Sequence, residues 1–158
     1  MRELEDGSFH LILDDIFACL KNRPPLLMIE EAYVRPGVSS CSERLLREDD
    51  WFFACHFPGD PMMPGVLQLE SLFNTAALAI KLLPGFREKT TNVSRITSVQ
   101  YRRHLRPGDR IRVETAIGRF RRGVASVHGT ITCGEELCCD AEFVLVVLDD
   151  LLPVGQGG

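Results

Sequence analysis

The longest hydrophobic stretch of the chain, Val66 to Leu83, is bracketed by Pro64-Gly65 before it and Pro84-Gly85 after it. Its apolar residues lie on all sides of a helical projection, which is typical of a helix that other elements cover completely. Polar residues interrupt the stretch at Gln68, Glu70, Ser71, Asn74 and Thr75. A membrane-spanning segment carries few such groups, so the pattern predicts a buried helix of a soluble domain.

After this helix the pattern changes to that of strands. Apolar runs separated by turn residues predict four strands, at 93–102, 109–118, 121–133 and 136–148. Turns are expected at 106–109, at 118–123 and at 134–135. Connections this short join neighbouring strands in antiparallel order.

Two further features precede the helix. Residues 9–21 carry apolar side chains at helical spacing and predict a short amphipathic helix, which Pro24-Pro25 ends. The apolar segments Leu26 to Val34 and Val38 to Leu46 flank a Pro-Gly turn and predict a hairpin of two strands.

Strands on both sides of one helix indicate an α+β domain, in which an antiparallel sheet wraps around one long central hydrophobic helix. A chain of 158 residues is too short for two independent cores of ordinary size. We therefore expect a single domain over residues 1–150. Residues 151–158 offer little to bury and are expected to form a disordered tail.

The composition, with 45% hydrophobic and 25% charged residues, is that of an ordinary globular protein. The formal net charge of -4 gives no basic footprint for nucleic acid. The six cysteines show no zinc-site spacing, and the N-terminus lacks a basic segment followed by an apolar run. These features predict a cytoplasmic protein with free thiols that binds neither nucleic acid nor membrane.

The segment that leads into the hydrophobic helix is unusually constrained. Three prolines and two glycines occur within the eight residues from Pro58 to Gly65, and each of them restricts or redirects the backbone. The helix begins with N–H groups that have no intrahelical partner, and the helix dipole adds to their attraction for negative charge. Such a helix start can stabilise charge that develops on an acyl carbonyl oxygen. Taken alone, the same features are also those of an ordinary well-capped helix start without a catalytic role.

Glu70 and Lys81 are the only charged residues between Val66 and Leu83. Lys81 lies near the helix end, where a cation is favourable and is expected to reach water, but Glu70 lies one turn inside a helix that should be buried. A first-turn residue that complements the helix dipole is the structural alternative for Glu70. His56 precedes the constrained turn, which can hold its ring against the helix start, although a lone histidine is more often structural.

A longer run of residues resembles a known signature. The run is His56-Phe57-Pro58-Gly59-Asp60-Pro61-Met62-Met63-Pro64-Gly65-Val66-Leu67, followed by Leu69-Glu70. It closely resembles the active-site signature of the 3-hydroxyacyl-(acyl carrier protein) dehydratases of fatty acid synthesis. A weaker resemblance at 23–27 and 101–109 extends it over most of residues 10–148. The resemblance implies the hotdog fold, in which a sheet wraps around one helix.

The resemblance also implies a reaction, the dehydration of a 3-hydroxyacyl thioester to the trans-2-enoyl thioester in fatty acid or related lipid or polyketide synthesis. This elimination needs a base at C2, an acid at the C3 hydroxyl and a stabilised carbonyl oxygen. His56 is the implied base, Glu70 the implied acid, and the backbone N–H of Gly65 the implied donor to the carbonyl. Further implied substrate-binding residues are Val66, Phe57 and Met63. No metal or organic cofactor is required.

The family builds its site from the histidine of one subunit and the acid of another, so the resemblance implies a homodimer, alone or as a trimer of dimers. The substrate is expected on acyl carrier protein or coenzyme A. Carrier proteins are typically acidic, which favours a basic docking surface. Candidates for carrier docking are Arg102, Arg103 and Arg106, with Arg119, Arg121 and Arg122 also available. Scattered, solvated arginines are the alternative.

Some positions differ from the family pattern. A glutamate at position 70 resembles the dehydratase-only branch, whereas Cys55-His56-Phe57 and Gly59-Asp60-Pro61 resemble the branch that also isomerises the double bond. Asn74 stands where many members have glutamine, and Pro24 replaces the usual second aromatic residue. These departures indicate a divergent member.

Two other functions stay open from the sequence. A hotdog thioesterase would hydrolyse the thioester with a carboxylate-activated water, and would release thiol without forming an enoyl product. A non-catalytic acyl-binding hotdog subunit would have the same fold but would catalyse neither dehydration nor thioester hydrolysis.

Overall fold

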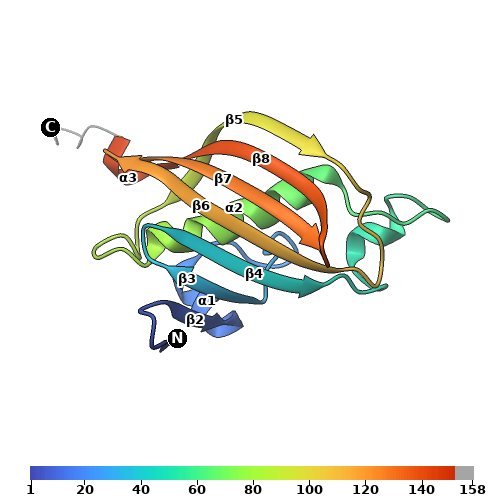
Figure 1. Cartoon of the computed structure of the whole chain (residues 1–158), viewed down its shortest axis with the longest axis horizontal. Coiled ribbons are helices and arrows are strands. Elements are labelled where there is room, and N and C mark those ends of the chain that lie inside the picture. The colour runs from blue at the N-terminus through green and yellow to red at the C-terminus, as the bar shows by residue number, and fades with distance from the viewer. Residues whose placement is uncertain (152–158) are drawn as a thin grey trace, which may run out of the picture.

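An eight-stranded antiparallel sheet curves around one long helix in the computed structural model, which describes residues 1–151 (Figure 1). The strands are β1 (Arg2–Glu3), β2 (Phe9–Ile12), β3 (Glu31–Arg35), β4 (Ser39–Leu45), β5 (Thr91–Tyr101), β6 (Arg110–Arg121), β7 (Val124–Cys133) and β8 (Glu136–Val147). The helices are α1 (Leu13–Cys19), the 3-10 helix η1 (Trp51–Ala54), α2 (Gly65–Lys81) and α3 (Leu148–Leu151). The order of strands across the sheet is β1-β2-β3-β4-β6-β7-β8-β5.

α2 is the predicted central helix, and most of its side chains are buried beneath the sheet. The helix approaches β7 so closely that a Cβ atom on Gly129 would lie 2.7 Å from Cδ2 of Leu72. A buried hydroxyl pair, Ser42 Oγ and Thr75 Oγ1 at 2.8 Å, links α2 to β4. The expected α+β arrangement of a sheet wrapped around one buried helix is confirmed.

Lys81 differs from expectation, because its side chain is buried rather than in contact with water. Its Nζ donates hydrogen bonds to the backbone carbonyls of Arg87, at 2.9 Å, and Lys89. The chain folds back over the end of α2 and covers the ammonium group. Desolvation by burial lowers the pKa of Lys81.

The four C-terminal strands are confirmed, with bounds within a few residues of those predicted. The largest difference is the β6–β7 turn, which contains only Arg122 and Gly123, both with positive φ (51° and 72°). Two consecutive residues of positive φ form the tight turn that suits the twist of a hairpin. β6 therefore continues to Arg121, into the segment that was predicted as turn, and β7 begins directly after that segment, at Val124.

The N-terminal part was predicted less well. Residues 9–12 form β2 instead of the start of a helix. Of the segment predicted as helical, only α1, which begins at Leu13, is a helix. β2 pairs with β3, with Leu11 opposite Ala32. The predicted hairpin exists as β3 and β4, but its first strand begins at Glu31 instead of Leu26.

The two ends of the sheet are unlike each other. β1 has only two residues, whereas β5 has eleven and pairs on one side only, with β8. Two register shifts occur in β5, between Val93 and Arg95 and between Ile96 and Ser98. Ile96 and Tyr101 on this strand are 42% and 47% exposed. β5 is thus a long, partly apolar edge strand, and the side that faces away from β8 has no neighbouring strand among residues 1–151.

No helix within residues 1–151 is long and apolar enough to cross a membrane. The expected disordered tail at 151–158 lies outside the described residues, apart from Leu151, which ends α3.

Candidate active site

His56 is held in one orientation by its own loop. Its backbone N–H donates to the Phe52 carbonyl of η1 (2.9 Å), and its carbonyl accepts from Met62 N–H (2.8 Å). Its ring Nδ1 lies 2.9 Å from the Met62 carbonyl oxygen. Since a carbonyl can only accept, Nδ1 carries the hydrogen and Nε2 of the neutral ring has a free lone pair. The geometry therefore presents a base at Nε2.

The start of α2 presents unused donors beside this loop. Pro64 is the N-cap residue, and its carbonyl accepts from the N–H groups of Leu67 (3.0 Å) and Gln68 (3.2 Å). The N–H groups of Gly65 and Val66 have no acceptor among residues 1–151. A 17-residue helix lies behind them, so its dipole favours negative charge at this point.

Tyr101, at the end of β5, covers one side of this helix start. A Cβ atom added to Gly65 would lie 2.7 Å from Cζ of Tyr101, which leaves no room for a side chain. Partial burial raises the pKa of the Tyr101 phenol. Tyr101 is not among the site residues predicted from the sequence, because no local pattern marks it.

Glu70 is half-buried and is hydrogen-bonded to two amides. Its Oε1 accepts from Nδ2 of Asn22 (3.0 Å) and Nδ2 of Asn74 (2.8 Å). Glu70 is the only ionisable residue that lines a small cavity of about 70 Å³ under β5. The other lining residues are Asn22, Phe73, Asn74, Ala77, Thr91, Asn92, Val93 and Leu145. A carboxyl group thus faces a small space walled by amides and apolar side chains.

His56 and Glu70 are not linked directly within a single chain. In the described part of the chain they share no hydrogen bond, and His56 does not line the cavity beside Glu70. Phe57 is 50% exposed and lines a surface pocket with Phe53 and Pro61. Met63 is 3% exposed, and its N–H donates to the carbonyl of Leu105 (2.8 Å). The site assignments from the sequence therefore stay predictions.

The arginines predicted for carrier docking already form ion pairs or hydrogen bonds within the chain. Arg103 forms a two-bond ion pair with Asp109 (2.9 and 3.2 Å) and a third contact with Glu136 (2.9 Å). The hydrogen bond with Asp109 raises the pKa of Arg103. Arg106 pairs with Asp60 (2.7 Å), and Arg102 donates to the side-chain oxygen of Gln100 (2.5 Å).

Another group of arginines forms no ion pairs within the described part of the chain. We define the arginine cluster as Arg95, Arg119, Arg121 and Arg122, which line one hollow of about 450 Å³ on the outer face of the sheet. Arg95 and Arg119 lie on one row across the strands, separated by Val144 and Ser126. None of the four forms an ion pair with a carboxylate of residues 1–151. This surface is locally basic on an acidic chain.

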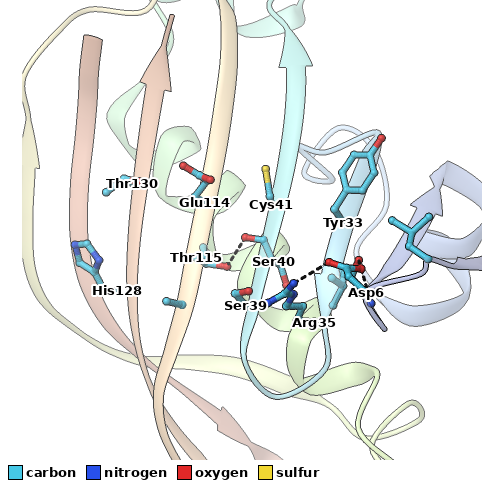
Figure 2. Close-up of a pocket in the computed structure, with 14 residues that line it drawn as sticks. Asp6, Tyr33, Arg35, Ser39, Ser40, Cys41, Glu114, Thr115, His128 and Thr130 are labelled. Atoms are coloured by element: carbon cyan, nitrogen blue, oxygen red, sulfur yellow. Dashed lines mark hydrogen bonds and ion pairs between the residues drawn. The ribbon is translucent and has the colours of Figure 1, made fainter. Parts of the chain in front are cut away.

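A larger hollow of about 510 Å³ lies elsewhere on the outer face, between the N-terminal segment and strands β3, β4, β6 and β7 (Figure 2). Its charged groups are already paired, Asp6 with Arg35 at 2.7 Å and Glu114 with Arg112 at 3.1 Å. His128 lies 3.2 Å from Asp140. Neither His56 nor Glu70 lines this hollow, so it adds nothing to the predicted chemistry.

Comparisons with known proteins match nearly the whole chain. The sequence profile of the FabA-like domain family matches residues 21–142. The 3-hydroxyacyl-(acyl-carrier-protein) dehydratase FabZ of Chloroflexus aggregans is 36% identical over 140 residues, which cover 88% of this chain and 97% of that protein. FabZ of Roseiflexus sp. strain RS-1 is 33% identical over 138 residues, covering 87% and 96%.

Solved structures show the same fold. The dehydratase heterocomplex ApeI:P from Xenorhabdus doucetiae has a TM-score of 0.72 at 12% identity, covering 86% of this chain and 95% of that one. The HP0420 homologue from Helicobacter felis has a TM-score of 0.64 at 12% identity, covering 84% and 98%. At these identities the likeness concerns the fold alone.

Proposed function

The chain belongs to the FabA-like domain family, and we propose that it removes water from a 3-hydroxyacyl thioester to leave the trans-2-enoyl thioester, in fatty acid synthesis. The observation that carries this function is the similarity to FabZ dehydratases at 30–36% identity over nearly their full length. The substrate of those relatives is carried on acyl carrier protein, as their name states. A thioesterase and a non-catalytic subunit are accordingly disfavoured.

Three groups supply the chemistry in this proposal. Nε2 of His56 takes the C2 proton, and the electron pair forms the C2–C3 double bond as the C3–O bond breaks. Glu70 gives a proton to the departing oxygen, which leaves as water. The N–H groups of Gly65 and Val66 bind the thioester carbonyl oxygen while it carries negative charge. Proton exchange with solvent then restores neutral His56 and protonated Glu70.

We propose that two chains form this arrangement, because within one chain His56 shares no hydrogen bond with Glu70 and does not line the cavity beside it. The exposed β5 edge supports a dimer, since it runs beside both the Glu70 cavity and the start of α2. A second chain docked along β5 would bring its own His56 loop toward this Glu70. We therefore propose a homodimer with two shared sites. Further assembly into a trimer of dimers rests on the family resemblance alone.

We also propose that the carrier docks on the arginine cluster in addition to Arg102, Arg103 and Arg106. The cluster has four positive charges without internal carboxylate partners, whereas Arg103 and Arg106 already have such partners. Compared with arginines that already have carboxylate partners, unpaired arginines attract an acidic protein at a smaller desolvation cost and raise its association rate. Coenzyme A thioesters, which present fewer negative groups, are expected to gain less from this surface.

The test of the proposed function is a single assay with two readouts. The purified protein is incubated with 3-hydroxyacyl thioesters of several chain lengths, while ultraviolet absorbance follows the enoyl thioester and a thiol reagent follows released thiol. Enoyl product without thiol is the expected result. Thiol without enoyl product would establish the thioesterase, and neither product at any chain length would leave only a binding role.

A further inference from the structure

The two oxygens of Glu70 have different surroundings. Oε1 accepts both amide hydrogen bonds, from Asn22 and Asn74, while Oε2 has no hydrogen-bond partner among residues 1–151. Asn74 lies one helical turn beyond Glu70 on α2. Asn22 lies 48 residues earlier, in the segment between α1 and β3.

The orientation of Asn74 is fixed by a further contact. Its Oδ1 accepts the backbone N–H of Met28 at 2.9 Å, and the side chain is 3% exposed. Because the Met28 N–H can only donate, Oδ1 must face it and Nδ2 must face Glu70. Asn74 thereby joins Glu70 to the same segment, between α1 and β3, that supplies Asn22.

We propose that Asn22 and Asn74 are positioning residues that select Oε2 of Glu70 as the oxygen that carries the catalytic proton. A carboxyl oxygen has two lone pairs in its plane, and two N–H donors occupy both of those on Oε1. A proton added to Glu70 therefore resides on Oε2. This inference rests on the proposed function, in which that proton is transferred to the departing hydroxyl, giving water and a Glu70 carboxylate.

The cavity beside Glu70 has room for the group that leaves. Its volume of about 70 Å³ exceeds the roughly 30 Å³ that one water occupies in the liquid. No other ionisable residue among those that line it can supply the proton. The two asparagines hold the carboxyl group while the cavity receives the product water.

Asn92 provides a matched control. It lines the same cavity, but its Oδ1 accepts the backbone N–H of Val93 at 2.8 Å, and it makes no hydrogen bond to Glu70. Loss of its side chain removes an amide from the cavity wall without removing a donor from Oε1. A general effect of cavity polarity would appear in Asn92 and Asn22 variants alike.

The experiment compares Asn22→Ala, Asn22→Asp, Asn22→His and Asn92→Ala by the saturating single-turnover rate of dehydration and by KM, in the dimeric full-length protein. Asn22→Ala is expected to slow dehydration about tenfold with little change in KM, since a misplaced reacting group lowers the rate of the chemical step. Asn22→Asp keeps the size but cannot donate when ionised, so it should be at least as slow. Asn22→His keeps a ring N–H donor and should retain more activity than Asn22→Asp. Asn92→Ala should slow dehydration less than Asn22→Ala, because Asn92 does not donate to Oε1 of Glu70.

Wild-type rates in Asn22→Ala and Asn22→Asp would overturn the inference, as would equal losses in the Asn22→Asp, Asn22→His and Asn92→Ala variants. If Asn22→Ala fails to fold, the isosteric Asn22→Asp and the donor-retaining Asn22→His decide alone. A wild type without dehydratase activity refutes the proposed function itself. An active wild type whose Asn22 variants dehydrate at the same rate refutes only the inference.

Discussion

At the scale of single residues, the proposed site depends on hydrogen bonds that fix which atom of a side chain can react. The Met62 carbonyl places the hydrogen of His56 on Nδ1, and two amides occupy Oε1 of Glu70. In the proposed mechanism the opposite atoms, Nε2 and Oε2, react with the substrate. Each proposed reactive group is thus oriented by a partner that does not itself take part in proton transfer.

Removal of either reactive group should stop the reaction without unfolding the protein. We expect Glu70→Gln and His56→Ala each to lower dehydration about 100-fold or more, the usual range for a lost general acid or base. Glutamine keeps the shape and can still accept from Asn22 and Asn74, but it has no carboxylic proton to give. Single-turnover rates with saturating acyl thioester exclude product release from the comparison.

The thermal unfolding midpoint of each variant serves as the control for this prediction. If Glu70 only complements the helix dipole, Glu70→Gln should cost at most about 1 kcal/mol of stability and leave activity nearly intact. Turnover near that of the wild type in the folded Gln variant would end the assignment of Glu70 as the acid.

The sequence marks the proposed reactive residues more clearly than the residues proposed to support them. His56 and Glu70 stand out because each is anomalous in its local pattern, in a constrained loop and in a buried helix. Asn22 has no such mark, and its proposed role follows from a contact across 48 positions of the chain. Tyr101 likewise meets Gly65 only because β5 ends beside the start of α2. Long-range proximity of this kind is not encoded in the spacing of neighbouring residues.

At the scale of elements, sequence patterns predict those whose character is uniform along their length. α2 and strands β5 to β8 have bounds close to those expected, because each combines a long apolar pattern with turn residues at its ends. Residues 9–12 carry a helical pattern but lie on the sheet, where Leu11 pairs with Ala32. Tertiary pairing overrides local preference there. The covered end of α2, with Lys81 inside, also depends on the fold of the following loop.

Burial of Lys81 gives a pH-dependent contribution to stability. Its pKa is lower in the folded protein than the ordinary value of 10.5, so between these two values the unfolded chain binds more protons and the free energy of unfolding rises with pH. We expect the stability of the wild type relative to Lys81→Met to increase as the pH is raised toward 10.5. Urea unfolding of both proteins at several alkaline pH values measures this difference. A pH-independent difference would contradict the prediction.

At the scale of the whole molecule, a site shared between subunits can be tested by mixing two inactive proteins. His56→Ala and Glu70→Gln homodimers each lack one group in both sites, whereas a heterodimer of the two has one intact site and one doubly defective site. Random exchange of subunits should give about half heterodimers and hence restore about a quarter of wild-type activity. Activity is measured before and after mild dissociation and reassociation. Mixtures that stay inactive although mass spectrometry shows heterodimers would place both residues in one chain's site.

Carrier docking on the arginine cluster should depend on salt and on the carrier. We expect the double variant Arg119→Gln/Arg121→Gln to raise KM about tenfold for acyl carrier protein thioesters at low salt and much less at high salt, because screening weakens exposed charges. KM for a small N-acetylcysteamine thioester should not change. Arg112→Gln is the matched control, since Arg112 is exposed on the same sheet face but is paired with Glu43 (2.8 Å). Equal KM changes for both substrates would contradict a docking role.

The unequal ends of the sheet also bear on how the protein avoids aggregation. A long exposed strand is a template on which further chains can add without limit. Here one end of the sheet is a strand of two residues, too short to template another, and the other is interrupted by the register shifts around Ser94 and Thr97. Bulged strands accept only a partner that matches their bends. We therefore expect edge-to-edge growth to stop after one addition at β5, so that the proposed homodimer forms instead of a fibre.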